Sequence, residues 1–218
     1  MNHTKPLVIW GCGGHAREVN HLCEQIGCEV VGFLDERLEM KGSIIDGIPV
    51  LGDLTDILSR RNHVEIVCAG VGDPALKRRF SRKTIELGFS IAPSLIHPAV
   101  YLSKRSHVGV GSVICEGVIL TTRVEIGDFV IINRGANISH DNQIGNYVTI
   151  APGVNVAGHV VIQEGAYLGI GCSVREKIEI GAWSMVGGGA FVHQDVPDRV
   201  LYAGVPAHFK KERGVGDE

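Results

Sequence analysis

The chain has 218 residues, of which 44% are hydrophobic, and a formal net charge of −3. This length allows one large domain or two modest ones, each with its own core. The 21 Lys and Arg residues are scattered and balanced by 24 Asp and Glu, which argues against nucleic acid as a partner. The sequence has no apolar run of membrane-spanning length and no secretory signal pattern, so we expect no membrane association and a cytoplasmic location.

The first 92 residues alternate between apolar runs and segments with helical spacing. The apolar runs predict strands at 7–10, 29–34 and 64–69, with a short extended segment at 47–51. Helical spacing and stop signals predict helices at 16–26, 54–61 and 74–87. Such alternation predicts a small parallel sheet with helices on its faces, so we assign 1–92 to a Rossmann-like α/β domain.

In sheets of this kind ligands bind beyond the carboxyl ends of the strands, and three of those ends carry suitable groups. Backbone amides at a helix start suit a phosphate, carboxylates suit a ribose or a base, and glycine allows close approach. The groups are Gly13, Gly14 and His15 after the first strand, Asp35 and Glu36 after the second, and Gly72 after the third. A Gly-rich turn also occurs for backbone reasons alone. Because the last glycine of the G-x-G-x-x-G spacing is absent, the pattern favours a nucleotide or nucleotide-sugar over a dinucleotide redox cofactor.

A period of six governs the chain from Ile96 to Val192. Every sixth residue of that stretch is Ile, Leu or Val. This period fits neither an amphipathic helix nor a half-exposed strand, but it suits a triangular solenoid in which three hexads form an eighteen-residue coil. We therefore predict that 93–218 form a parallel β-helix of hexapeptide repeats with a C-terminal tail. Asn142 and Ile178 break the pattern of small residues or valine at one hexad position.

A solenoid exposes its ends, which must be covered. The N-terminal domain could cover one end, and the tail from Pro197 the other.

One histidine of the solenoid, His140, stands next to a carboxylate, Asp141. A neighbouring carboxylate orients an imidazole and stabilises its charged form, which suits a general base. The other outward histidines are interpreted as solvated side chains: His97, His107, His159 and His193. A three-histidine zinc site is not built within the chain, because His140 is followed eighteen and thirty-six residues later by Gly158 and Glu176. We expect no metal, although another subunit could supply histidines.

Several segments resemble a known family. WGCGGHAREV at 10–19, FLDE at 33–36, GVGDP at 70–74 and IHPAV at 96–100 are similar to bacterial sugar acetyltransferases typified by sialic acid O-acetyltransferase and the UDP-4-amino-sugar N-acetyltransferase of bacillosamine synthesis. The resemblance implies a left-handed β-helix, acetyl-CoA as co-substrate, a nucleotide-sugar held by the N-terminal domain, and a homotrimer.

Carried over by position, the resemblance assigns a role to each candidate residue. Substrate contacts fall at Gly13, Gly14, His15, Asp35, Glu36 and Gly72. His140 is the general base, Asp141 its electrostatic support, and Asn133 a polar group at the sugar. Acetyl-CoA contacts fall at Thr149, Ile170 and Gly188. Lys210 and Lys211 could meet the cofactor phosphates or belong to a solvated tail. The implied reaction is N-acetylation of a nucleotide-linked amino sugar of the 4-amino-4,6-dideoxy type in surface-glycan synthesis; sugar O-acetylation and a non-catalytic scaffold are the alternatives.

Overall fold

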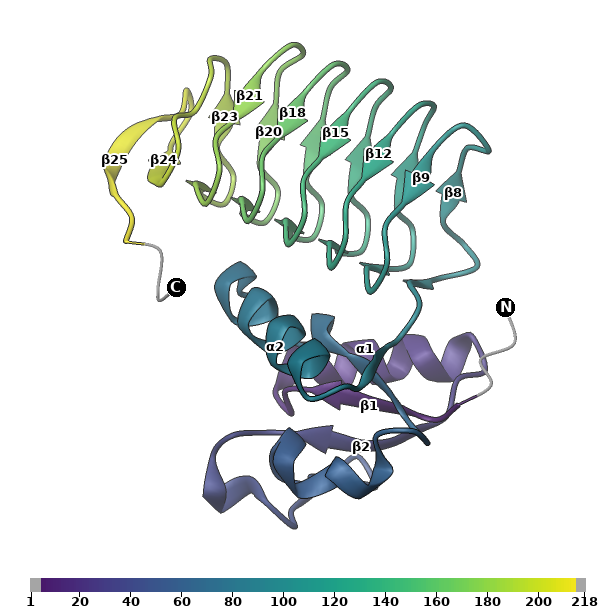
Figure 1. Cartoon of the computed structure of the whole chain (residues 1–218). Helices are drawn as coiled ribbons and strands as arrows, with labels where there is room; N and C mark the ends of the chain where they lie inside the picture. Colours follow the sequence, from purple (N-terminus) through teal and green to yellow (C-terminus); the bar gives the residue numbers. More distant parts are fainter. Residues whose placement is uncertain (1–4, 215–218) are drawn as a thin grey trace.

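The computed structural model describes residues 5–214 and consists of an α/β part followed by a β-solenoid (Figure 1). The α/β part has a parallel four-stranded sheet in the order β2-β1-β5-β6. Its strands are β1 (Leu7–Trp10), β2 (Val30–Leu34), β5 (Glu65–Val67) and β6 (Ser90–Ile91). The helices are α1 (Gly14–Gln25) and α2 (Pro74–Glu86), with short 3-10 segments η1 (Leu38–Met40), η2 (Leu54–Arg60) and η3 (Cys68–Gly70). A small hairpin joins β3 (Ile44–Ile45) and β4 (Ile48–Pro49).

Helices cover both faces of this sheet, so its central strand is buried on both sides. All four residues of β1 are fully buried; Leu7 and Ile9 pack in the core cluster that contains α1, whereas Val8 and Trp10 pack in the cluster that contains α2 and η2. Asp73 caps α2 by accepting a hydrogen bond from the Leu76 backbone N–H at 2.9 Å. The predicted strand 64–69 ends earlier than expected, since the chain turns into η3 at Cys68.

The solenoid consists of two-residue strands that pair in parallel with strands eighteen residues away. The three faces of its prism are three sheets. The docked face contains β7 (Leu95–Ile96), β10 (Val113–Ile114), β13 (Ile131–Ile132), β16 (Thr149–Ile150), β19 (Tyr167–Leu168) and β22 (Met185–Val186). The first open face contains β8 (Tyr101–Leu102), β11 (Ile119–Leu120), β14 (Asn137–Ile138), β17 (Asn155–Val156), β20 (Ser173–Val174) and β23 (Phe191–Val192). The second open face contains β9 (His107–Val108), β12 (Glu125–Ile126), β15 (Gln143–Ile144), β18 (Val161–Ile162) and β21 (Glu179–Ile180).

The axis of the prism is filled by the residues of the six-residue period. Ile126, Ile144 and Ile162 stack in successive coils and belong to one continuous core cluster. Each strand therefore points one residue of its pair inward, which satisfies burial and pairing with the same register. The prediction of an α/β domain followed by a parallel β-helix of hexapeptide repeats is confirmed.

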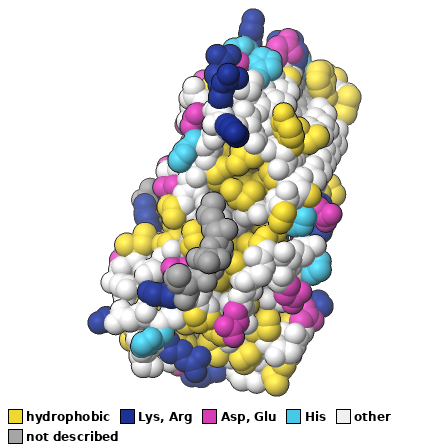
Figure 2. Space-filling view, turned by 90° about the vertical axis from the view of Figure 1, so that its right-hand side faces the viewer, with side chains coloured by type: hydrophobic (Ala, Val, Ile, Leu, Met, Phe, Trp, Pro, Cys, Tyr) yellow, Lys and Arg dark blue, Asp and Glu magenta, His cyan; other side chains and the backbone are white. Residues whose placement is uncertain are grey.

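The N-terminal domain packs along the side of the solenoid, so the expectation that it covers one end is wrong. Outward residues of the docked face, Leu95, Val113 and Ile131, are buried in the same cluster as the first sheet strand and α1. Helix α2 lies between the sheet and the solenoid (Figure 1). The first coil is left partly open, since the inward Leu102 is 36% exposed. Figure 2 shows hydrophobic side chains at the surface of this end of the molecule.

A ladder of aromatic rings along one corner helps to fix this packing. Phe129 and Tyr147, one coil apart, stack with ring centroids 5.3 Å apart. The next position is Gly165, and the ring of Trp183 fills the space a side chain would occupy there. Arg78 of α2 lies 4.3 Å above the Trp183 ring, so helix and solenoid also meet through a cation–π contact.

The chain passes from one sheet to another between Ile91, the end of β6, and Leu95, the start of β7. At the other end, β24 (Val200–Ala203) continues the docked face beside β22, and β25 (His208–Glu212) pairs antiparallel with it. The tail thus extends over the last coil. No helix among the described residues has the length and apolarity to cross a membrane.

Candidate active site

His140 lies at the corner between β14 and β15, where the two open faces meet. The next position of this corner, which Asp141 occupies, has the same backbone conformation in four successive coils. Its residues Arg123, Asp141, His159 and Lys177 all have φ between 54° and 60°. Each coil is tied to the next by a backbone hydrogen bond, such as that from His159 N–H to the His140 carbonyl at 3.1 Å. The corner therefore presents a vertical row of side chains with fixed spacing.

The His140 imidazole is paired with the neighbouring carboxylate. His140 Nδ1 lies 2.7 Å from Asp141 Oδ2, and the His140 side chain is about half exposed. The hydrogen bond from His140, helped by the charges of Arg123 and His159, lowers the pKa of the Asp141 carboxyl below its usual value. Asp141 is therefore an anion at neutral pH. This arrangement leaves Nε2 of His140 free to accept a proton.

Asp141 has two further neighbours in the row. Arg123 Nε lies 2.7 Å from Asp141 Oδ1, and His159 Nε2 lies 3.7 Å from Asp141 Oδ2. The His140 and His159 rings meet edge to face with centroids 5.2 Å apart. His159, interpreted from the sequence as merely solvated, thus belongs to the site. Its spacing of eighteen from Asp141 was the signal that could have found it.

The two histidines and the carboxylate also form the group of possible metal ligands that the described residues contain, with ligand atoms within 4.8 Å of one another. A catalytic zinc site uses three protein ligands with an open fourth position. Here Asp141 already accepts hydrogen bonds from His140 and Arg123. The arrangement is that of an imidazole held by a carboxylate.

Asn133 lies at the preceding corner, between β13 and β14. Its side chain is mostly buried and Nδ2 donates to the Ile150 carbonyl at 3.1 Å. The structure gives Asn133 no direct hydrogen bond to His140. Its neighbour Arg134 forms an ion pair with Glu18 of α1. Gly14, Arg17, Glu18, His21, Asp46 and Arg134 line a cleft of about 450 Å³ between the two parts.

The first predicted substrate segment is open to solvent. Gly13 is the N-cap of α1 and Gly14 its first residue, and a Cβ at either position would meet no atom within 4 Å. The backbone amides at this helix start are thus accessible to an anion. His15 is less accessible: its Nε2 donates to the Ala69 carbonyl at 3.2 Å, and burial lowers its pKa.

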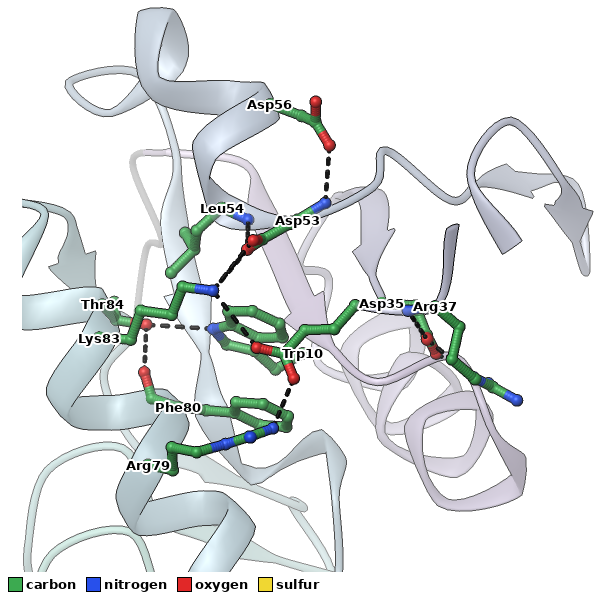
Figure 3. A network of polar contacts seen from close by, with 11 residues as sticks. Trp10, Asp35, Arg37, Asp53, Leu54, Asp56, Arg79, Phe80, Lys83 and Thr84 are labelled. Atoms are coloured by element: carbon green, nitrogen blue, oxygen red, sulfur yellow. Dashed lines mark hydrogen bonds and ion pairs between the residues drawn. The ribbon is translucent and has the colours of Figure 1, made fainter. Parts of the chain in front are cut away.

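The second segment is held by a network of charges (Figure 3). Arg37 Nε donates to Asp35 Oδ1 at 2.9 Å, and Arg37 Nη2 donates to Asp35 Oδ2 at 2.8 Å. Cys12 Sγ also donates to Asp35 Oδ2, at 2.9 Å. The hydrogen bonds from Arg37 lower the pKa of Asp35 to about 2. Glu36 is paired with Arg79 and Lys83 of α2. Asp35 therefore keeps its charge, and the internal partners of both carboxylates compete with any ligand.

The third segment connects the two parts of the molecule. The Gly72 carbonyl accepts a hydrogen bond from Thr149 Oγ1 at 2.7 Å. Lys77 of α2, completely buried, donates to Thr149 Oγ1 at 2.8 Å and to the Val148 carbonyl at 3.0 Å. The Thr149 side chain is thus committed to the docked face, and its backbone N–H donates to the Ala166 carbonyl at 3.0 Å, so neither is free for the predicted cofactor contact.

Ile170 and Gly188 are adjacent in successive coils and both are exposed, with Ile170 at 63%. A Cβ at Gly188 would lie 3.1 Å from Ile170 Cγ2, so glycine keeps the backbone open beside the isoleucine. Lys210 and Lys211, in β25, are exposed as well.

Within the chain the predicted substrate segments and His140 are separated. The N-terminal domain lies against the docked face, while His140 occupies the opposite corner of the prism. A hexapeptide solenoid with an exposed imidazole–carboxylate pair, joined to an α/β domain with an open helix start, defines the class of hexapeptide-repeat acyltransferases.

Comparison with known proteins agrees with this class. The PglD N-terminal domain family matches residues 6–84. The structure of PerB from Caulobacter crescentus with CoA and GDP-perosamine is similar, at 33% identity over 96% of this chain and 99% of that one, with a TM-score of 0.87. The acetyltransferase domain of PglB from Neisseria gonorrhoeae with acetyl coenzyme A is 31% identical over 95% of this chain and 100% of that one, at a TM-score of 0.85. WeeI from Acinetobacter baumannii is 26% identical over 95% and 100%, at 0.85. No curated protein matches.

The chain belongs to the hexapeptide-repeat family of sugar acetyltransferases that includes PerB and PglB. It is an acetyl-CoA-dependent enzyme, as the sequence predicted, and acetyl-CoA is its co-substrate.

Proposed function

We propose that this enzyme acetylates the amino group of a nucleotide-linked amino sugar of the 4-amino-4,6-dideoxy type, in bacterial surface-glycan synthesis. The single observation that carries the proposal is the exposed His140 imidazole held at 2.7 Å by Asp141. In the perosamine N-acetyltransferase from Caulobacter crescentus, structures are known of variants in which one histidine is replaced by asparagine or alanine. These variants support the choice of a histidine as the residue to test in this chain.

The chemistry needs one base. An amine at neutral pH is mostly ammonium, so one proton must pass to solvent before the nitrogen can attack the thioester carbonyl, and a second is lost as the C–N bond forms. Nε2 of His140 takes the proton of the attacking nitrogen, and anionic Asp141 stabilises the resulting imidazolium. The C–N bond forms, the C–S bond breaks, and the imidazolium returns the proton to the thiolate of CoA. A backbone amide of the solenoid stabilises the oxyanion between these steps.

The substrate contacts follow from the accessible groups. The diphosphate binds the amides of Gly13 and Gly14 at the start of α1, with His15 beside it. Asp35 and Glu36 hold the ribose or base after rearrangement of their ion pairs.

The loop at Gly72 forms the third wall of the nucleotide site. Asn133 contacts the sugar. The pantetheine of acetyl-CoA runs along the coils past Ile170 and Gly188, toward Lys210 and Lys211.

The proposal includes a homotrimer in which one subunit presents its nucleotide-sugar to His140 of another. It explains why the docked face and the His140 corner lie on opposite sides of one prism. The first open face also exposes Tyr101, Ile119 and Phe191, which suits burial against a second copy. Light scattering on the purified protein measures the assembly. The free cysteines, five of them buried, fit a reducing compartment such as the cytoplasm.

Two variants test the role of His140. His140→Ala and His140→Asn should each lower kcat by about 100-fold or more, because general base catalysis contributes roughly that much. Circular dichroism and light scattering check that fold and assembly are kept. Activity is measured with acetyl-CoA and a panel of UDP-, GDP- and dTDP-linked amino sugars, with sialic acid as the O-acetylation comparison. Wild-type kcat/KM in an intact variant would exclude His140 as the base, and turnover of sialic acid alone would exclude the amino-sugar acceptor.

A further inference from the structure

We propose that Gly158 and Asn142 form a seat that positions the His140 imidazole for proton transfer. Both residues act through the His140 ring, so both are positioning residues. The inference rests on the proposed role of His140 as the base, and it explains two features of the corner that catalysis by His140 and Asp141 leaves unused.

The first feature is the contact between Gly158 and the ring. Gly158 lies one coil above His140, and a Cβ there would be 2.6 Å from Cε1, 2.7 Å from Nε2 and 3.1 Å from Nδ1 of the imidazole. Real Cβ atoms essentially never approach other atoms so closely, so alanine would force the ring to move. The ring therefore occupies the volume that any other residue at position 158 would need.

The backbone gives no other reason for glycine at this position. Gly158 is absent from the residues with positive φ, so its conformation is open to any side chain. The same corner position holds Thr122 two coils away and Glu176 in the next coil, both with full side chains. Glycine is thus required in one coil of the row, the coil directly above His140.

The second feature is a buried amide beside the same turns. Asn142 is fully buried, whereas the same position in neighbouring coils holds Val124, Val160 and Ile178. Its Nδ2 donates to the carbonyls of Ser139 at 2.8 Å and Ala157 at 2.9 Å, and its Oδ1 accepts from Val160 N–H at 2.7 Å.

These three bonds satisfy the amide and bracket both turns. Ser139 precedes His140, and Ala157 precedes Gly158. The amide therefore reinforces the backbone ladder between the turn that carries the ring and the turn against which the ring lies. A hydrophobic side chain in its place would pack like its neighbours but would leave the spacing of the two turns to the backbone ladder alone.

Together these contacts bound the ring on three sides. Gly158 limits it above, Asp141 holds Nδ1 at 2.7 Å, and the His159 ring closes a further side at 5.2 Å between centroids. Because a displacement of about 1 Å at a catalytic group can cost about 100-fold in rate, a seat of this kind affects kcat directly.

The test compares Gly158→Ala, His140→Ala, their double variant and the control Glu176→Ala. Glu176→Ala places the same alanine at the same corner position one coil further on, away from the His140 ring, and it should keep wild-type kcat. Gly158→Ala should lower kcat by about 10-fold or more while the KM for acetyl-CoA stays within about 2-fold, because the cofactor contacts are elsewhere. In the His140→Ala background, Gly158→Ala should cause no further loss, since no ring is left to displace. Asn142→Val should also lower kcat.

The outcomes separate this inference from the role of His140. Wild-type kcat in a folded, correctly assembled Gly158→Ala protein, with His140→Ala inactive, overturns the seat and leaves His140 as the base. An equal loss from Gly158→Ala with and without His140 also overturns the seat, because the effect then bypasses the ring. Full activity of His140→Ala overturns both proposals.

Discussion

Replacing Lys77 by methionine should remove a pH dependence from the stability of the protein. The Lys77 amine is completely buried between α2 and the docked face, where it donates to Val148 and Thr149. Burial lowers its pKa well below the usual value of lysine, and the charge of Asp73 only partly offsets this. In the unfolded chain the same amine titrates near ~10.4.

The sign follows from proton counting. Between the folded and the unfolded pKa, the unfolded chain binds one more proton at Lys77 than the folded protein, so the free energy of unfolding rises as the pH rises through this range. One proton corresponds to a slope of at most about 1.4 kcal/mol per pH unit. Methionine has no proton to bind, so the slope at this site disappears. The Lys77→Met variant also loses the two hydrogen bonds of the amine, which are worth about 1 kcal/mol each. This loss of stability does not depend on pH in this range.

The assay is urea unfolding of wild type and Lys77→Met at pH 7, 8 and 9, at one protein concentration so that assembly does not change the comparison. The stability of the wild type relative to the variant should increase with pH, by up to about 1.4 kcal/mol per unit. Buried cysteines such as Cys23, whose pKa is raised to about 12 by burial, titrate alike in both proteins and cancel. Two parallel pH profiles would show that the folded protein does not bury a neutral amine, and the reasoning would be refuted.

Two further variants test the core and the nucleotide site. Ile144→Ala removes an inward side chain from the middle of the solenoid and should lower the free energy of unfolding by about 2–5 kcal/mol; a loss below 1 kcal/mol in urea unfolding would contradict a close-packed axis. Asp35→Asn should weaken nucleotide-sugar binding in calorimetry. Because Asp35 has its pKa lowered to about 2, it stabilises the wild type above pH ~4, and this stability is lost as the pH falls toward 2. The variant should lack that loss in thermal melts, and an unchanged acid profile would contradict the Arg37 pairing.

The solenoid could be predicted from the sequence because its determinants repeat locally. Ile126, Ile144 and Ile162 are each the second residue of a two-residue strand, so one periodic pattern specifies both burial and pairing. The strand-and-helix order of the first domain was equally local. Its boundaries shifted at Cys68, where the chain leaves the strand for a 3-10 turn in spite of an apolar pattern.

The docking of the two parts could not be predicted in this way. Lys77 reaches Val148 and Thr149 across more than seventy residues, and no periodicity relates these positions. For the same reason the sequence did not show that Thr149, an outward residue named as a cofactor contact, is covered by the N-terminal domain. His159 was different: its distance of eighteen from Asp141 placed it in the same row, and the sequence contained that information.

The pairing of each strand with one eighteen residues away sets a rule for how this chain can lengthen or shorten. An insertion of eighteen residues adds one complete coil and leaves all other coils in register. An insertion of six keeps every apolar residue facing the axis but rotates everything after it by a third of a turn, so that a different wall of the prism would then face the N-terminal domain. Changes of length in the solenoid are therefore restricted to whole coils of eighteen residues, even where the hydrophobic pattern would permit insertions or deletions of six.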